Sequence, residues 1–337
     1  NAIAIGASAA YMNQGQISIA IGQDSAKNDQ NIKCIAIGNK AGQNLQGKAG
    51  IGTQKGNCIA IGTESAQFGQ GQLSFQPGAT LFGDSTYDNI IIEEPGCIAV
   101  GNRAGIAEQT GLSIAIGTCA GIRNQGQGLG GPGVPAGSSI AIGTYAGAVE
   151  QHEGAIAIGI KAGSQEQNEN CISIGNYKRA GINQTQVVPE NISIGLEAGY
   201  NGQGFNRSAF SQGGIAIGTR AAFKEQRGNS IAIGHLAGAA AQGNFAGATG
   251  QGNSIAIGTE AGRDNQEEYA VAMGASAAAV NQGPNAVAIG HNAGNTDQQA
   301  NSIILNASGN PVNNSAAAYG GATGVTGSFL VNPIRKL

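Results

Sequence analysis

The sequence predicts an all-β protein, a parallel β-roll or β-solenoid of about sixteen coils of 16 residues each. Three observations support this class: a recurring Ile-Ala-Ile-Gly motif, a shortest spacing of 16 residues between copies, and a strand pattern inside the motif. A degenerate copy, Ile303-Ile304-Leu305-Asn306, follows the other fifteen. Those fifteen close variants end at Gly6, Gly22, Gly38, Gly62, Gly101, Gly117, Gly143, Gly159, Gly175, Gly195, Gly218, Gly234, Gly258, Gly274 and Gly290.

Positions in a coil are counted from the motif glycine, which is position 0. Ile, Val or Met stands at −3 and −1, and only Ala or Ser stands at −2. This alternation of β-branched and small residues is typical of a strand with two different faces. We expect the isoleucines to lie inside the roll and the Ala face to pack against partner subunits, because a row of small residues permits close approach. A single coil buries too little apolar surface to offset its ordering, so an obligate oligomer is expected.

The glycine at position 0 and a small pair at +3 and +4 mark two corners of the coil. Each coil is therefore expected to contain two strands. Spacings longer than 16 residues locate insertions, nearly all of them after the second strand, so they are expected to leave the roll along one edge. The roll is assigned to residues 1–306, a cap or junction to 307–337, and the inserts to about 47–56, 72–95, 126–137, 185–190, 203–213 and 243–252.

Glutamine stands at +8 in fourteen of the fifteen coils. Identical amides stacked at the strand spacing can hydrogen bond to one another in a ladder, although a solvated polar row remains an alternative. The predicted ladder consists of Gln14, Gln30, Gln46, Gln70, Gln109, Gln125, Gln151, Gln167, Gln203, Gln226, Gln242, Gln266, Gln282 and Gln298.

The composition excludes several classes of protein. Its 58 glycines follow no Gly-X-Y period, which excludes collagen, and the net charge of −3 offers no basic surface for nucleic acid. No apolar stretch is long enough for a membrane span. The chain opens inside a coil without a signal peptide, as a fragment or a processed product would.

Four of the five cysteines, Cys34, Cys58, Cys97 and Cys171, occupy position −4, just before the first isoleucine of the strand. The first three belong to consecutive coils and are expected to stack in one column. Their number and spacing do not fit a disulfide framework or a zinc site. Buried free thiols are one interpretation, and cross-links between adjacent coils or subunits are the other. The cysteines favour assembly in a reducing compartment.

No group of residues suggests catalysis. The histidines His152, His235 and His291 stand on separate coils without a nucleophile or carboxylate at useful spacing. The acidic residues of insert 72–95 do not match a calcium loop. We therefore expect a non-enzymatic protein without catalytic residues, metal site or cofactor.

The inserts are the candidate recognition loops because they concentrate aromatic residues. These side chains either pin the loops onto the roll or form exposed platforms for a sugar or a receptor. The candidate recognition residues are Phe75, Phe82, Tyr87, Phe205, Phe210 and Phe245.

The repeats resemble those of the trimeric autotransporter adhesin (YadA-like) head, a resemblance that covers Asn1 to about Asn306. It implies a left-handed roll and a parallel homotrimer. The coil of 16 residues is somewhat longer than the usual adhesin unit. The C-terminal segment, with Asn301-Ser-Ile-Ile-Leu-Asn and Ser328-Phe-Leu-Val-Asn-Pro-Ile-Arg335, is similar to the junction before an endosialidase-type chaperone in fibre-like proteins of large DNA viruses.

Together these features favour a structural fibre or spike on a virion surface that attaches to a host glycan or protein receptor, with capsid or other virion proteins as further partners. The alternatives are a bacterial trimeric adhesin head and a self-assembling extracellular filament. The expected location is therefore the virion surface or the extracellular space. Neither nucleic-acid binding nor membrane insertion is expected.

Overall fold

The computed structural model describes nine ranges of the chain and divides it into two units, Asn1–Cys171 and Ile172–Leu337. Both units are built from short parallel strands, and the described residues contain no helix. The chain is an all-β parallel β-roll, as the sequence predicts. The described ranges are 1–46, 57–72, 96–110, 112–126, 137–175, 190–205, 213–243, 252–314 and 327–333.

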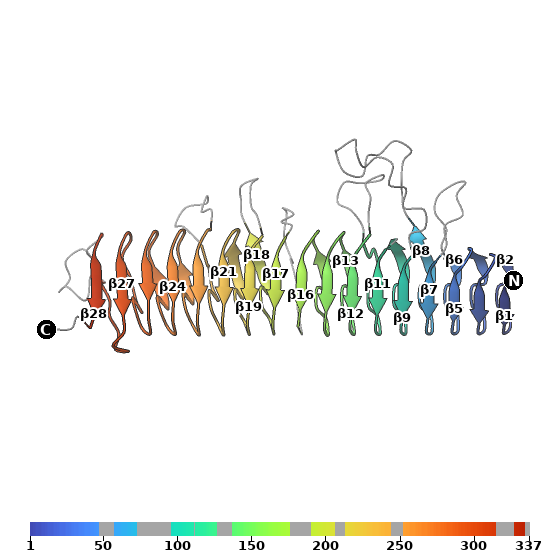
Figure 1. The fold of residues 1–337 in the computed structure, drawn as a ribbon, viewed down its shortest axis with the longest axis horizontal. Helices are drawn as coiled ribbons and strands as arrows, with labels where there is room; N and C mark the ends of the chain where they lie inside the picture. The colour runs from blue at the N-terminus through green and yellow to red at the C-terminus, as the bar shows by residue number, and fades with distance from the viewer. Residues whose placement is uncertain are drawn as a thin grey trace, which may run out of the picture. The chain divides into compact units, whose positions relative to one another are not determined.

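The motif strands form one side of each unit, here called the isoleucine wall (Figure 1). In the first unit they are β1 (Ile3–Ile5), β3 (Ile19–Ile21), β5 (Ile35–Ile37), β7 (Ile59–Ile61), β9 (Ile98–Val100), β11 (Ile114–Ile116), β12 (Ile140–Ile142) and β14 (Ile156–Ile158). In the second unit they are β16 (Ile172–Ile174), β17 (Ile192–Ile194), β19 (Ile215–Ile217), β21 (Ile231–Ile233), β22 (Ile255–Ile257), β24 (Val271–Met273), β26 (Val287–Ile289), β27 (Ile303–Asn306) and β28 (Phe329–Asn332).

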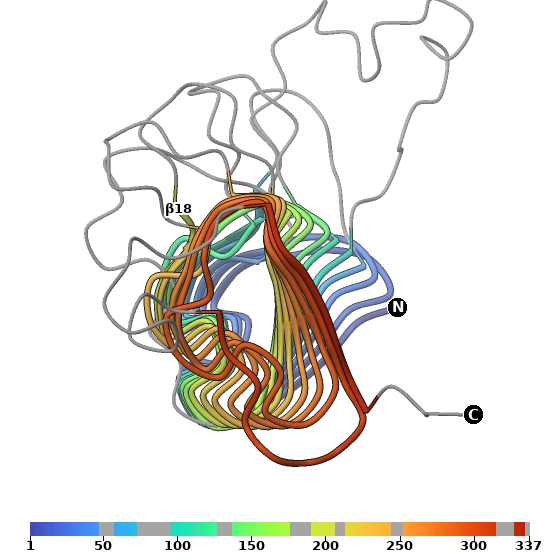
Figure 2. The ribbon, with the colours of Figure 1, turned by 90° about the vertical axis from the view of Figure 1, so that its left-hand side faces the viewer.

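The strands that contain the +8 glutamine form the opposite side, here called the glutamine wall. In the first unit they are β2 (Met12–Gln14), β4 (Asn28–Gln30), β6 (Asn44–Gln46), β8 (Phe68–Gln72), β10 (Ala107–Thr110), β13 (Val149–Gln151) and β15 (Gln165–Gln167). In the second unit they are β18 (Asn201–Phe205), β20 (Lys224–Arg227), β23 (Asp264–Gln266) and β25 (Val280–Gln282). The end-on view shows a flattened coil, with β18 opposite the straight isoleucine wall (Figure 2).

Successive coils pair in parallel and in register. Between β5 and β7, for example, Ile35 lies beside Ile59 and Ala36 beside Ala60. The motif glycines make this stacking possible, because their φ angles lie between 111° and 133° and their backbones are in close contact. A Cβ atom built on Gly234 would lie 2.5 Å from the carbonyl oxygen of Gly258 in the next coil. Both properties exclude any larger residue at this corner.

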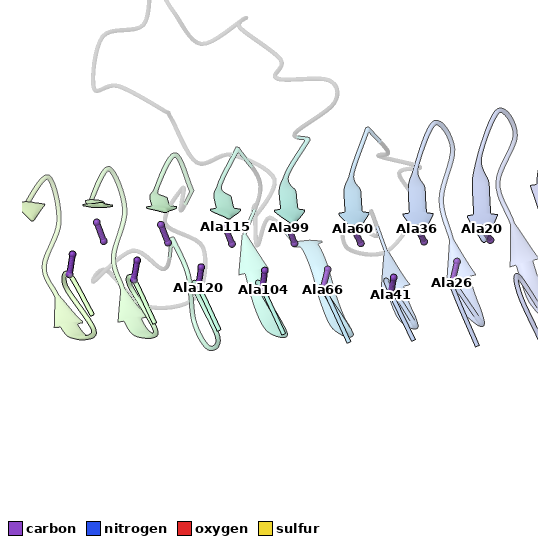
Figure 3. Packing of buried hydrophobic residues seen from close by; sticks show 14 residues of the cluster. Ala20, Ala26, Ala36, Ala41, Ala60, Ala66, Ala99, Ala104, Ala115 and Ala120 are labelled. Atoms are coloured by element: carbon purple, nitrogen blue, oxygen red, sulfur yellow. The ribbon is translucent and has the colours of Figure 1, made fainter. Parts of the chain in front are cut away.

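The interior of the roll contains alanine, not isoleucine. The −2 alanines from Ala20 to Ala288 are fully buried, and Ser173 and Ser193 in the same column are 2% and 1% exposed. They meet a second row of buried alanines from the +3 and +4 corner, such as Ala26 and Ala41 (Figure 3). The expectation that the isoleucines lie inside and the Ala face meets partner subunits is therefore wrong.

The reason for this inversion is the thickness of the coil. The +3 and +4 corner folds back against the motif strand, so that a Cβ atom built on Gly147 would lie 3.2 Å from the Cβ atom of Ala141. The +8 glutamines fill the space beside this contact, as Gln151 does by donating to the carbonyl oxygen of Ile140 at 2.8 Å. Two columns of isoleucine would overfill this space. A surface of small residues does indicate close packing, but the surface that packs against it belongs to the same chain.

The last coils of the second unit close this interior with larger side chains. Ile304 of β27 occupies the column of Ala288 and is fully buried, and Leu330 of β28 lies beside it in register. Asn306 replaces the motif glycine, and its amide donates to the carbonyl oxygens of His291 and Asn310 at 2.7 and 2.6 Å. Part of the segment assigned to a cap, residues 307–337, thus adds strand β28 to the isoleucine wall.

Candidate functional site

The outward face of the isoleucine wall is the candidate functional site. Its −3 and −1 side chains point away from the alanine interior and are half-buried or exposed, although each is flanked by the coils above and below. In the first unit Ile61, Ile116 and Ile142 are 38%, 38% and 36% exposed, and in the second unit Met273 and Ile289 are 40% and 41% exposed. Each unit therefore presents two columns of apolar side chains to its surroundings.

These two columns are regular and uncharged. In-register pairing repeats the same side chain at the strand spacing of about 4.8 Å along each unit. None of the isoleucine-wall strands that the structure describes contains a charged residue. Continuous apolar surface of this kind is typical of a protein interface, since water penalises its exposure.

A column of alternating charges lies at position +2, next to the isoleucine wall. It begins with Asp24, Lys40, Glu64 and Arg103 on successive coils of the first unit. Glu64 accepts a hydrogen bond from Arg103 Nε at 2.8 Å and lies 3.9 Å from Lys40 Nζ. The hydrogen bond from Arg103 lowers the pKa of Glu64, and the charges of Arg103 and Lys40 add to this effect. Because Arg103 and Lys40 are exposed, these pairs contribute little to stability.

The second unit repeats this arrangement with Glu197 and Arg220, whose Oε2 and Nε atoms are 2.6 Å apart. The Arg220 guanidinium also lies 5.5 Å from the ring centre of Phe223, which stacks on Tyr200 at 5.0 Å. Sequence reasoning missed this column. Its signal is the alternation of sign at position +2, which is visible in the sequence once the coils are aligned.

The +8 glutamines lie inside the roll. Each buried side chain donates its amide to the carbonyl oxygen of the −3 residue of its own coil, as Gln266 does to Ile255 at 2.8 Å. Side chains of adjacent coils also bond to one another, and Gln266 donates to Gln282 at 3.0 Å. Hydrogen bonds between side-chain amides connect Gln14–Gln30–Gln46 and Gln125–Gln151–Gln167 in the first unit, and Gln226–Gln242–Gln266–Gln282–Gln298 in the second.

Three other residues of the predicted ladder remain. Gln109 is buried and donates to the carbonyl oxygens of Ile98 and Ser113 at 3.0 and 3.1 Å. The backbones of Gln70 and Gln203 belong to β8 and β18, but their side chains lie outside the described part of the chain. Where the structure describes their side chains, the +8 glutamines from Gln30 onward are buried and hydrogen bonded within the roll.

The candidate recognition residues fall outside the described residues. Phe75, Phe82, Tyr87, Phe210 and Phe245 belong to undescribed inserts, and only the backbone of Phe205 is placed, at the end of β18. The ends of two inserts are described. A Cβ atom on Gly126 would lie 3.0 Å from the Cα atom of Gly137, and one on Gly243 would lie 2.7 Å from that of Gly252. These inserts therefore begin and end at neighbouring points of the coil.

Two further features bear on function. Within the described ranges, no three His, Cys, Asp or Glu residues are grouped so that they could hold a metal ion. The same part of the chain contains no helix that would span a membrane.

No family model matches the chain, and no curated protein sequence or solved structure matches it either. The candidate site is therefore interpreted from its own chemistry. It is an apolar, uncharged sheet face that repeats from coil to coil and is suited to a second surface of the same regularity.

Proposed function

We propose that the chain is a non-enzymatic structural protein that assembles into a parallel homotrimer through the isoleucine wall and serves as a fibre or spike on a virion surface, where it attaches to a host. The observation that carries this proposal is the double column of exposed Ile, Val and Met. A monomer would leave this surface in water along each unit.

A second copy of the same chain is the partner that fits this surface. In a rotationally symmetric assembly whose axis runs parallel to the direction in which the coils stack, equivalent coils of the copies lie at the same level along the axis. The apolar columns of one copy then face the apolar columns of the next along the whole contact. The +2 charges then lie beside the contact, at its rim. The number of three copies rests on the resemblance of the repeats to the adhesin head.

The assignment to a virion rests on the resemblance of the C-terminal segment to viral fibre-like proteins. An antibody against the chain should label the surface of particles produced by the organism that encodes it. Label confined to a bacterial outer surface would instead support an adhesin head, and label on free filaments would support an extracellular filament.

Assembly is tested by lysine substitutions on the isoleucine wall. Ile142→Lys in the first unit and Ile289→Lys in the second each place a charge in the proposed contact, so sedimentation velocity should show loss of the trimer. Ile160→Lys is the matched control, because Ile160 is 47% exposed in the turn after Gly159 and does not belong to the wall. A wild-type chain that sediments as a monomer would contradict the proposal, as would variants that assemble normally.

A further inference from the structure

Three cysteines form a buried column at position −4 in the first unit. Cys34, Cys58 and Cys97 belong to consecutive coils and are 0%, 0% and 1% exposed. The Sγ atoms of Cys58 and Cys97 are 3.3 Å apart. This contact joins residues that are 39 positions apart in the sequence.

The backbone at these two positions has the geometry that a disulfide needs. Cys58 and Cys97 each precede a strand of the isoleucine wall, and the residues that follow them, Ile59 and Ile98, pair in register. Neighbouring strands are separated by about 4.8 Å, which lies within the range of Cα separations bridged by disulfides. An S–S bond of about 2.05 Å requires the two sulfurs to approach by little more than 1 Å, a movement that side-chain rotation provides.

The column itself tolerates small polar side chains. Serine occupies position −4 on flanking coils, and Ser139 Oγ donates to Ser113 Oγ at 3.2 Å. On the other side, the Cys34 backbone N–H donates to Ser18 Oγ at 3.3 Å. Three sulfurs on consecutive in-register coils lie along a line and do not surround a common centre. The arrangement therefore suits a bond between two neighbours better than an ion held by all three.

We propose that Cys58 and Cys97 form a disulfide as the chain folds, and that this bond joins two adjacent coils. A low-molecular-weight disulfide such as oxidised glutathione supplies the oxidising equivalents. One cysteine thiolate attacks it, forming a mixed disulfide and releasing one glutathione thiolate. The second cysteine thiolate then attacks the protein sulfur of the mixed disulfide and releases the second glutathione thiolate. The two protons lost by the cysteines leave as the thiol protons of two reduced glutathione molecules.

The closed roll protects these thiols. The hydrogen bond between Cys34 and Cys58 raises the pKa of Cys34, and burial raises it further. The pKa of Cys58 is lowered by its contact with Cys34, but contact with Cys97 and burial raise it more, so it lies well above its ordinary value. Because the thiolate is the reacting species, the bond forms while the coils are closing and is shielded afterwards.

The bond would tie together the two coils on either side of the longest insert, residues 72–95. A cross-link between distant residues restricts the unfolded chain, so the oxidised protein resists unfolding more strongly than the reduced protein. Oxidation thus strengthens the roll at the point where the chain is most interrupted.

The test uses the full chain made by cell-free synthesis in either oxidised or reduced glutathione, so that folding takes place at a known redox state. Free thiols are then alkylated in denaturant. Digestion after Lys, Arg and Glu places Cys34, Cys58 and Cys97 on separate peptides, residues 34–40, 56–64 and 94–103. Mass spectrometry without reduction identifies the linked pair. Cys119 and Cys171, which are also buried thiols, serve as internal controls.

In oxidised glutathione we expect peptides 56–64 and 94–103 to be linked in most molecules, with Cys34, Cys119 and Cys171 alkylated. Cys97→Ser should abolish this link, whereas Cys34→Ser should retain it. The oxidised wild type should also unfold at a higher temperature than Cys97→Ser, and a reducing agent should remove the difference. Alkylation of Cys58 and Cys97 to the same extent as Cys119 and Cys171 would overturn the proposal, as would links scattered among all five cysteines.

Discussion

At the scale of single residues, the fold depends on positions that accept very few types of side chain. The motif glycines combine a positive φ angle with contact between the backbones of adjacent coils. The −2 alanines fill the interior, and the +8 glutamines donate to backbone carbonyl groups there. Equivalent substitutions in different coils are expected to have similar effects, because the same contacts recur in each coil.

Substitution of a motif glycine should destabilise the roll strongly. In Gly234→Ala the new Cβ atom meets the backbone of Gly258, and the φ angle of 133° strains any residue with a side chain. We expect a loss of at least about 3 kcal/mol in the free energy of unfolding, measured by chemical denaturation. Gly327→Ala is the control, since Gly327 also has a positive φ angle but no atom within 4 Å of the added Cβ. Equal losses in both variants would refute the role of the inter-coil contact.

Removal of a buried amide should cost stability in proportion to the bonds that it makes. Gln266 donates to the carbonyl oxygens of Ile255 and Ala270 and to the side chain of Gln282. Gln266→Ala leaves these acceptors buried, and we expect a loss of about 2 to 4 kcal/mol in the free energy of unfolding. The exposed Gln16, changed to Ala, should have little effect. A loss below about 1 kcal/mol for Gln266→Ala would show that water replaces the amide.

Two half-buried carboxyl groups should make stability depend on pH. Burial raises the pKa of Glu153 above its ordinary value of 4.5, and the charge of Glu169 raises it further. The folded state therefore holds the proton more tightly than the unfolded state, so stability falls as the pH rises from about 4.5 through the folded-state pKa. Glu153→Gln should melt at a higher temperature than the wild type at pH 7, and the difference should disappear in acid. Glu267→Gln should behave alike, because burial is the main cause there too.

At the scale of elements, the two walls have different functions. The isoleucine wall provides uninterrupted in-register pairing within each unit, while the glutamine wall is divided into short sheets and is followed by the inserts. Insertions after the glutamine wall leave the motif strands in register, as pairing between β11 and β12 shows on either side of residues 127–136. The chain can therefore vary its inserts without changing the wall proposed for assembly.

Deletion of an insert should leave stability almost unchanged. Removal of residues 127–136 joins Gly126 to Gly137, and removal of 244–251 joins Gly243 to Gly252, which are neighbours in space. We expect changes within about 1 kcal/mol in the free energy of unfolding, because loop closure depends weakly on length. Attachment of the purified protein to host cells should fall if the inserts recognise the receptor. Undiminished attachment after deletion of every insert would place recognition elsewhere.

At the scale of the whole molecule, assembly is expected to depend on apolar burial and not on charge. The isoleucine-wall strands contain no charged residue, whereas the ion pairs at +2 are exposed. Raising sodium chloride from about 0.1 M to about 1 M weakens exposed ion pairs but leaves apolar association intact. Sedimentation velocity should therefore show the same trimer at both concentrations. Dissociation at high salt would indicate that the +2 charges hold the copies together.

The sequence by itself determined the length of the coil, the positions of the motif strands and the corner glycines. Each of these depends on spacing or on a local backbone requirement. It also predicted that the glutamines recur in one column. The alternation of residues along a strand distinguishes its two faces. It does not show which face points inward, because it does not reveal which face packs against another part of the chain.

Only the tertiary structure decided this orientation. The second row of alanines, at +3 and +4, returns against the motif strand and makes the interior of the regular coils too narrow for two columns of isoleucine. Small side chains therefore fill the core, and the larger ones form the outer face. The same inversion moved the candidate interface from the −2 alanines to the isoleucines beside them. Packing between segments that are separate in the sequence sets the thickness of the roll, and that thickness determines which face is left for a partner.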